Sequence, residues 1–247
     1  MDAATGEILW SHFVTPGDDA PVVSEERLYW ASDSIYCFNL TSHQPEWVVG
    51  GGDGFNSNPV LHNGKLYCSV NKYGVPNAIK CFNAQNGTLI WTRNISCSIV
   101  SSCLSIWNNN LIVPTFEDPL CALNLESGSI MWENYDAIQG YWDTSPCVVD
   151  HVIYIGGYDG EVHAINAFTG DLIWSNKMSP VSAVEATPAY CDGIVVCGNR
   201  ETMFALQADN GSALWQNDKG LHGSPTIADG IVYWGAFGKS INHADSI

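Results

Sequence analysis

A tryptophan recurs at almost constant spacing along this 247-residue chain, and the repeat limits the folds that the chain can adopt. The segment NAFTGDLIW (166–174) closely resembles NAQNGTLIW (83–91), and DAATGEILW (2–10) has the same frame. The repeat tryptophans follow one another at similar intervals, and these residues are Trp10, Trp47, Trp91, Trp132, Trp174 and Trp215. A nearly fixed period of roughly 40 residues is typical of proteins built from one repeated supersecondary unit.

Each repeat contains four short segments with the alternation of β-strands. In the fourth repeat we expect strands within 144–150, 151–158, 159–167 and 169–176, with an Asp–Gly hairpin signal at the start of the third. A glycine before the last strand supplies a positive φ and lets a tryptophan approach the bare backbone. The second repeat, LTSHQPEW (40–47), replaces that glycine turn with Gln44-Pro45. Four strands in each repeat of this length predict an all-β protein of four-stranded antiparallel propeller blades.

The two ends of the chain fall in phase with the repeat. The stretch that follows Trp215 and the stretch that ends at Trp10 together have the length of one further repeat. We therefore predict a six-bladed β-propeller, a single domain over 1–247, closed by pairing residues 1–13 with 221–247 in one blade. The alternative is a fragment of a longer propeller whose ends happen to fall in phase.

Charge and cysteine content narrow the partners and the compartment. The chain has 26 acidic and 9 basic residues, a net charge of −17, and no basic stripe for phosphates. We therefore expect neither nucleic acid nor membrane as a partner, and a cationic or neutral ligand fits better. No apolar stretch approaches a membrane span, and MDAATGEILW is unlike a signal peptide. Nine cysteines, mostly in apolar runs, suggest reduced thiols, so we expect a cytoplasmic monomer.

A ring of polar residues is expected at one mouth of the propeller channel. The first strand of most repeats begins at a proline, and the residues three positions earlier are Asp18, Asn56, Val100, Asp143, Glu185 and His222. The preceding positions, which include Phe55 and Trp142, are mostly apolar. Polar groups backed by apolar ones are what a small-molecule site needs.

Several chemistries are open to this ring. It could bind an amine or another cation, and the ligand-binding candidates are Asp18, Phe55, Asn56, Tyr141 and Trp142. It could carry out acid–base chemistry, and the catalytic candidates are Asp143, Glu185 and His222. It could hold Ca²⁺ through oxygen atoms, although no metal-ligand set can be assigned. It could also be a wet channel mouth whose polar groups are only solvated.

Other polar and sulfur-containing residues have simpler interpretations. Cys37 and Cys81 align with alanines in the third strand of other repeats, so we expect them at a small buried position. His151 and His163 are expected at strand edges or hairpins. No Cys/His cluster has the spacing of a zinc site.

The repeated segments resemble the blades of the pyrroloquinoline-quinone-type β-propellers, over nearly the whole chain. Members of that superfamily include quinone-dependent dehydrogenases, a periplasmic outer-membrane assembly lipoprotein and a propeller appended to cytosolic acyl-adenylating enzymes. The dehydrogenases usually carry eight blades and two adjacent cysteines, and this chain has no Cys-Cys pair. That difference counts against bound quinone, so the cofactor is left unassigned. The assembly lipoprotein would need a lipidated signal and a periplasm, and neither is visible.

These observations favour a soluble binding module. We expect it to recognise a small cationic or neutral ligand, or a protein segment, at the channel mouth. The alternative is an enzyme that uses the rim carboxylates and His222 on a small molecule. A quinone-dependent dehydrogenase is the third interpretation.

Overall fold

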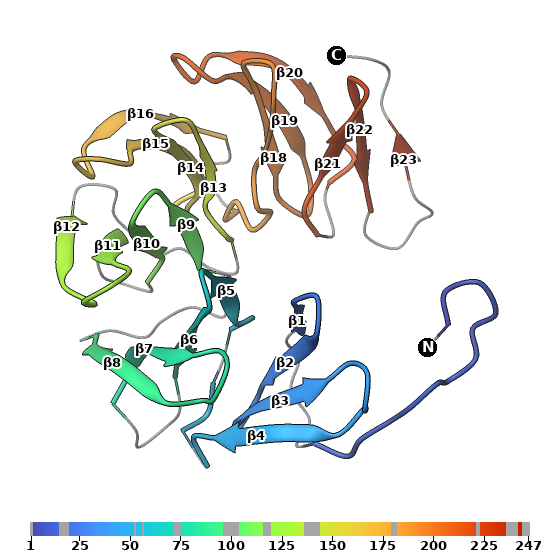
Figure 1. The fold of residues 1–247 in the computed structure, drawn as a ribbon. Helices are drawn as coiled ribbons and strands as arrows, with labels where there is room; N and C mark the ends of the chain where they lie inside the picture. Colours follow the sequence, from blue (N-terminus) through green and yellow to red (C-terminus); the bar gives the residue numbers. More distant parts are fainter. Residues whose placement is uncertain are drawn as a thin grey trace. The chain divides into compact units, whose positions relative to one another are not determined.

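The protein is built from short antiparallel strands (Figure 1). The computed structural model describes residues 2–14, 20–51, 53–55, 57–71, 76–95, 104–115, 120–135, 144–178, 182–220, 223–235 and 242–243. These residues contain strands, bends and turns but no helix, so none of them forms a helical span long and apolar enough for a membrane. Contacts divide the chain into a first unit, Met1–Thr92, and a second unit, Arg93–Ile247.

The first unit carries two four-stranded sheets, each with its strands in sequence order. The strands of the first sheet are β1 (Val22–Val23), β2 (Arg27–Ala31), β3 (Ile35–Asn39) and β4 (Pro45–Val49). Those of the second sheet are β5 (Val60–His62), β6 (Lys65–Val70), β7 (Ala78–Asn83) and β8 (Leu89–Asn94), the last of which ends just past the unit boundary.

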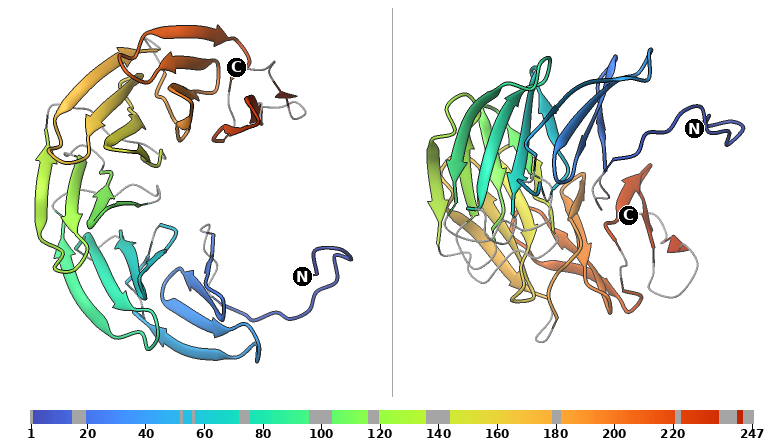
Figure 2. Two further views of the ribbon diagram at one scale, coloured as in Figure 1. Left: turned by 45° about the horizontal axis from the view of Figure 1, so that its top comes forward. Right: turned by 90° about the horizontal axis from the view of Figure 1, so that it is seen from below.

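The second unit carries three more four-stranded sheets and one of three strands, again with neighbours in sequence order (Figure 2). The first two sheets contain β9 (Ser105–Trp107), β10 (Asn110–Val113), β11 (Leu120–Asn124) and β12 (Ile130–Asn134), then β13 (Cys147–Val149), β14 (Val152–Gly156), β15 (Glu161–Asn166) and β16 (Leu172–Lys177). The last two contain β17 (Ala189–Cys191), β18 (Ile194–Gly198), β19 (Met203–Gln207) and β20 (Ala213–Asn217), then β21 (Thr226–Ala228), β22 (Ile231–Trp234) and β23 (Asn242–His243).

The predicted fold class is confirmed at the level of the sheets. The protein is all-β, and five sheets have the expected four antiparallel strands. In the fourth repeat the four strands lie within the expected ranges, apart from β16, which runs one residue further to Lys177. The described residues 2–14 contain no strand. Six blades, closure by the chain ends and a single domain over 1–247 stay predictions.

Trp47, Trp132 and Trp174 pack on the turn glycines of the following sheet. A Cβ on Gly170 would lie 2.5 Å from Cε3 of Trp132, and one on Gly87 would lie 2.8 Å from Cε3 of Trp47. In the second unit, Nε1 of Trp132 donates to the carbonyl oxygen of Ala167 at 3.0 Å. The glycine is needed at these turns because φ is positive and because the indole ring occupies the space of a side chain.

The residue two positions after the tryptophan adds a second bond to the same turn. Asn176 Nδ2 donates to the carbonyl oxygen of Gly211 at 2.5 Å, and Asn134 Nδ2 donates to that of Gly170. β12 and β16 are thus each held to the neighbouring turn by an indole ring and a side-chain amide, whereas Arg93 of β8 donates its Nε to the carbonyl oxygen of Gly128 at 2.6 Å. This contact buries the ring and satisfies a carbonyl that the strand ladder leaves open.

A small residue lies opposite each of these tryptophans in the third strand. Cys37 pairs with Trp47, and Ala164 pairs with Trp174. Cys37 and Cys81 are fully buried, so the predicted small buried position is confirmed. A β-bulge follows directly, between Ala164 and Ile165, and the same bulge recurs after Cys37, Ala122 and Ala205.

The turn of the second repeat differs from the sequence interpretation. Aligned on Trp47, His43 takes the position of the glycine, and its φ of 59° is in the left-handed region. Gln44 and Pro45 come after that position, and Pro45 begins β4. Histidine is tolerated here because a polar residue can adopt this conformation at moderate cost in a tight turn.

Candidate functional site

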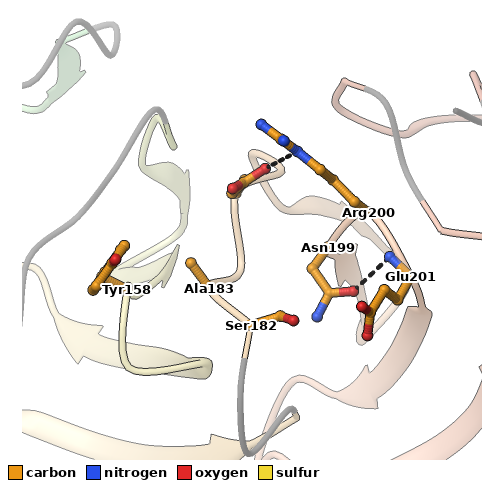
Figure 3. Close-up of a pocket in the computed structure, with 7 residues that line it drawn as sticks. Tyr158, Ser182, Ala183, Asn199, Arg200 and Glu201 are labelled. Atoms are coloured by element: carbon orange, nitrogen blue, oxygen red, sulfur yellow. Dashed lines mark hydrogen bonds and ion pairs between the residues drawn. The ribbon is translucent and has the colours of Figure 1, made fainter.

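A pocket of about 430 Å³ lies between two turns and a loop of the second unit (Figure 3). We call it the turn pocket, and its lining residues are Tyr158, Ser182, Ala183, Glu185, Asn199, Arg200 and Glu201. Tyr158 belongs to the β14–β15 turn and Asn199–Glu201 to the β18–β19 turn. The volume is within the range of small-molecule sites.

The loop between β16 and β17 is held against the ends of two strands, and this places Glu185. Val184 is fully buried, and its N–H donates to the carbonyl oxygen of Gly157 at 3.0 Å. Ala186 N–H donates to the carbonyl oxygen of Gly198 at 3.3 Å. Because neighbouring residues of an extended segment point to opposite sides, Glu185 faces the pocket while Val184 packs inward.

The opposite wall is a turn built by one asparagine. Asn199 is buried, and its Oδ1 accepts the backbone N–H groups of Glu201 and Thr202, both at 2.9 Å. Asparagine commonly bonds its own backbone two residues on, which fixes such turns. The turn presents Arg200 and Glu201 to the pocket.

One ion pair crosses the turn pocket. Arg200 Nε donates to Glu185 Oε2 at 2.9 Å, and the two side chains are 69% and 36% exposed. An ion pair this exposed contributes only about 0–1 kcal/mol to stability. Its main effect is to place a cation and an anion side by side where a partner can reach both.

Of the site residues predicted from the sequence, the structure describes Glu185 and Phe55. Glu185 lines the turn pocket and meets Arg200 instead of a histidine. Phe55 is 4% exposed, pairs with Val70 and packs edge-on against Phe82 in the core of the first unit. The other candidates lie outside the described residues, namely Asp18, Asn56, Tyr141, Trp142, Asp143 and His222. Their roles stay predictions.

Sequence reasoning missed Tyr158, Asn199 and Arg200. One signal could have found them, since both turns follow the second strand of a repeat, at "GGYDG" and "CGNRE". The candidate ring was built from the positions before the first strand alone. Side chains from two neighbouring repeats meet here, and only the folded arrangement brings them together.

A second, more open pocket of about 690 Å³ lies in the first unit. Its lining includes Arg27, Tyr29, His62 and Asn83. Arg27 Nε donates to Glu46 Oε2 at 2.6 Å, and hydrogen bonds from Asn39 and then Arg27 hold the pKa of Glu46 below its ordinary value. It is lined by turns that follow the first and third strands of a sheet, whereas the turn pocket is lined by turns that follow the second strand.

The repeated sheets and docked tryptophans define a protein of the pyrroloquinoline-quinone-type repeat, as the sequence resemblance implied, and that resemblance is confirmed. The family model described as "Outer membrane protein assembly factor BamB" matches residues 1–235. The chain belongs to this family.

Individual relatives are distant and longer. An outer membrane protein assembly factor BamB of Yersinia pestis is 23% identical, over 95% of this chain and 68% of its own length. A tetrathionate hydrolase of Acidithiobacillus ferrooxidans is 22% identical, over 94% of this chain and 52% of its own length. The crystal structure of BamB from Moraxella catarrhalis has a TM-score of 0.76 at 16% identity, covering 93% of this chain and 72% of that one. This last likeness shows the fold alone.

The prediction of a cytoplasmic location is wrong. The family that contains this chain is that of an outer membrane assembly factor, which overturns it. The inference rested on the cysteines, and the physical reason for its failure is burial. Cys37 and Cys197 are fully buried, and burial raises the pKa of Cys37 to about 11 and that of Cys197 to about 12. Such thiols act as small apolar residues and do not report a compartment.

Proposed function

We propose that this chain is a protein-interaction module of the outer membrane assembly type that acts in the periplasm. A segment of a partner protein binds at the turn pocket. The single observation that carries the proposal is the family match over residues 1–235. The pocket supports it, because it offers accessible polar and aromatic groups from two repeats in one place.

The chemistry of the turn pocket suits a polypeptide. Arg200 and the Nδ2 of Asn199 supply donors, while Glu185 and Glu201 supply acceptors. The side chain of Tyr158 is 53% exposed and adds a flat ring with a polar tip. Tyrosine and arginine are enriched at the centres of protein interfaces. An extended segment with its own N–H and C=O groups can pair with both kinds of polar group.

The finer predictions of the fold belong to the same proposal. We propose a monomeric, single-domain propeller of six blades. In its last blade, residues 1–13 pair with residues 221–247 and close the ring. The repeat motif DAATGEILW (2–10) supports this closure, because the last sheet has three strands among the described residues and this motif precedes the fourth strand in other repeats. A small cationic or neutral ligand at the channel mouth remains the alternative occupant. No observation on the described residues favours acid–base catalysis, since Glu185 is paired with Arg200.

A photo-cross-linking amino acid in place of Tyr158 tests the proposal in cells. We expect adducts with proteins of the outer membrane assembly machinery, identified by mass spectrometry. The matched control replaces Tyr233, which is 42% exposed on β22 and lies outside the turn pocket. Arg200→Glu is expected to reduce the Tyr158 adducts several-fold. Equal adducts from both positions, or none from position 158, would overturn the proposal.

A further inference from the structure

Three side chains with metal-ligating atoms gather beside the turn pocket. They are Asp159 in the β14–β15 turn and Glu161 and His163 on β15, and one ligand atom of each lies within 4.8 Å of the others. Glu161 and His163 share a face of the strand because side chains alternate with a period of two. Asp159 is brought to the same face by the turn.

The histidine sets this cluster apart from surface carboxylates. His163 is 4% exposed, whereas the sequence placed it at an edge or hairpin. Its Nε2 lies 3.4 Å from Oδ2 of Asp159. Oδ1 of that carboxylate accepts the N–H of Glu161 at 2.9 Å, so the backbone aims Oδ2 at the imidazole. Two of the three ligands are therefore held in place before any ion arrives.

A glycine leaves the space beside these ligand atoms. A Cβ on Gly157 would collide with Oδ1 of Asp159 and would lie 3.1 Å from Nε2 of His163. Any other side chain at position 157 would occupy the space next to the Asp159 carboxylate. The chain thus keeps room at a point where nitrogen and oxygen ligands converge.

In another repeat the strand position of His163 is occupied by a positively charged residue. Lys80 takes the place of His163 in β7, one residue before the small residue of that strand. Its Nζ lies 2.7 Å from Oδ2 of Asp53, and both side chains are mostly buried. Asp53 comes from the loop before β5, so the comparison concerns the strand position of His163 and not the position of Asp159. In the fourth repeat a histidine stands there, and its imidazole can bind a cation instead of supplying one.

We propose that Asp159, Glu161 and His163 bind a divalent transition-metal ion of the zinc class. One nitrogen and two carboxylate oxygens are a ligand set that Zn²⁺ accepts, with water completing the site. Ligand atoms at about 2.0–2.1 Å from a tetrahedral zinc lie about 3.4 Å apart, which matches the His163–Asp159 separation. The site is independent of the proposed function, although Tyr158 shares its turn.

Lys177 carries a positive charge that disfavours metal binding at this site. It pairs with Glu161 across β15 and β16, and it interacts electrostatically with the Asp159 carboxylate. An ammonium group near two carboxylates competes with a metal ion for the same negative charge. Lys177→Met is therefore expected to tighten metal binding, which is the opposite direction to the loss of a ligand.

Calorimetric titration of the metal-free full chain with ZnCl₂ tests the site. We expect one ion per chain with a Kd on the order of micromolar. His163→Phe copies Phe204, the residue at this position in β19, and so keeps a buried ring without a ligand atom. It should weaken binding at least tenfold, as should Asp159→Asn, which keeps an oxygen for the Glu161 N–H. Asp171→Asn removes one exposed carboxylate elsewhere and should leave the Kd unchanged.

Two results of the titration would overturn the proposed metal site. The absence of binding by the wild-type chain at about 100 micromolar zinc would overturn the site, and so would a Kd that His163→Phe and Asp159→Asn leave unchanged. Circular dichroism shows whether each variant is folded. If His163→Phe fails to fold, Asp159→Asn and Lys177→Met decide, through loss and gain of affinity. Zinc should also raise the melting temperature of the wild type more than that of Asp159→Asn.

Discussion

The indole ring of Trp10 lies parallel to the imidazole of His43, with ring centroids 5.3 Å apart and an interplanar angle of 14°. His43 occupies the turn position at which other repeats have glycine, and its φ is 59°. Nε2 of His12 lies 2.6 Å from the carbonyl oxygen of His43 and donates to it, as Asn176 does to Gly211. A repeat without its glycine therefore still docks a tryptophan, by stacking one ring on another.

Substitutions at His43 separate the stacking from the backbone strain. His43→Ala should lose ring stacking worth about 0.5–1.5 kcal/mol and keep the left-handed strain. His43→Gly loses the same stacking but relieves strain of about 1–2 kcal/mol. The glycine variant should therefore be the more stable of the two, and close to wild type, in urea unfolding. An alanine variant as stable as the glycine variant would contradict the assigned backbone strain.

The turn glycine under Trp132 should be far less replaceable than a glycine in open space. Gly170 has a φ of +79° and a Cβ there would meet the indole ring at 2.5 Å. Gly230 has a φ of +70° but no described heavy atom within 4 Å of a Cβ, which makes it a matched control. Gly170→Ala should cost about 1–3 kcal/mol more than Gly230→Ala in chemical unfolding. Equal losses would mean that backbone conformation alone explains the glycine.

The sequence predicted the strands and the tryptophan repeat because both depend on local spacing. It could not predict the β-bulge after Ala164, because the facing residues Leu172, Ile173 and Trp174 form one continuous apolar run. The bulge turns Trp174 inward and leaves Leu172 and Ile173 40% and 46% exposed. Apolar character alone does not say which of three consecutive side chains is buried.

The turn pocket was only partly predictable for a different reason. Glu185 was found because it keeps a fixed distance from the first strand of its repeat. Arg200 lies 15 residues further on, in a turn whose direction depends on the buried side chain of Asn199. A contact between side chains of different turns has no periodicity, so no repeat alignment reveals it.

Cys197 should behave as a buried apolar residue toward thiol reagents. Burial raises the pKa of its thiol to about 12. Desolvation also raises the pKa of the Cys191 thiol, but that side chain is partly exposed at the end of β17. Alkylation depends on the thiolate and on access. Mass spectrometry of the native chain treated with iodoacetamide at pH 8 should show Cys191 labelled well before Cys197. Denaturant should remove the difference, and rapid labelling of Cys197 in the native chain would argue against its burial.

Alkaline pH should destabilise the second unit through two buried acids. Burial is the largest cause that raises the pKa of Cys197 and of Tyr154, each to about 12, above ordinary values of 9.0 and 10.0. Folding favours the neutral forms, so this stability is complete below about pH 9 and is lost as the pH rises toward 12. The melting temperature should fall over that window, and Cys197→Ala should make the fall shallower. A slope unchanged by Cys197→Ala would exclude the thiol as a cause.

Proline substitutions near the N-terminus test the proposed closure of the ring. If residues 6–12 pair as the fourth strand of the last blade, alternate N–H groups there bond to the neighbouring strand. Ile8 and Leu9 are adjacent and exposed, so only one of them can donate to that ladder. Either Ile8→Pro or Leu9→Pro should therefore speed hydrogen exchange in β23, the strand that a fourth strand would pair with, while the other should have little effect. Because β23 belongs to the second unit, disruption of the first unit alone does not produce this result. Exchange in β23 that neither variant changes would show that the chain ends do not share a blade.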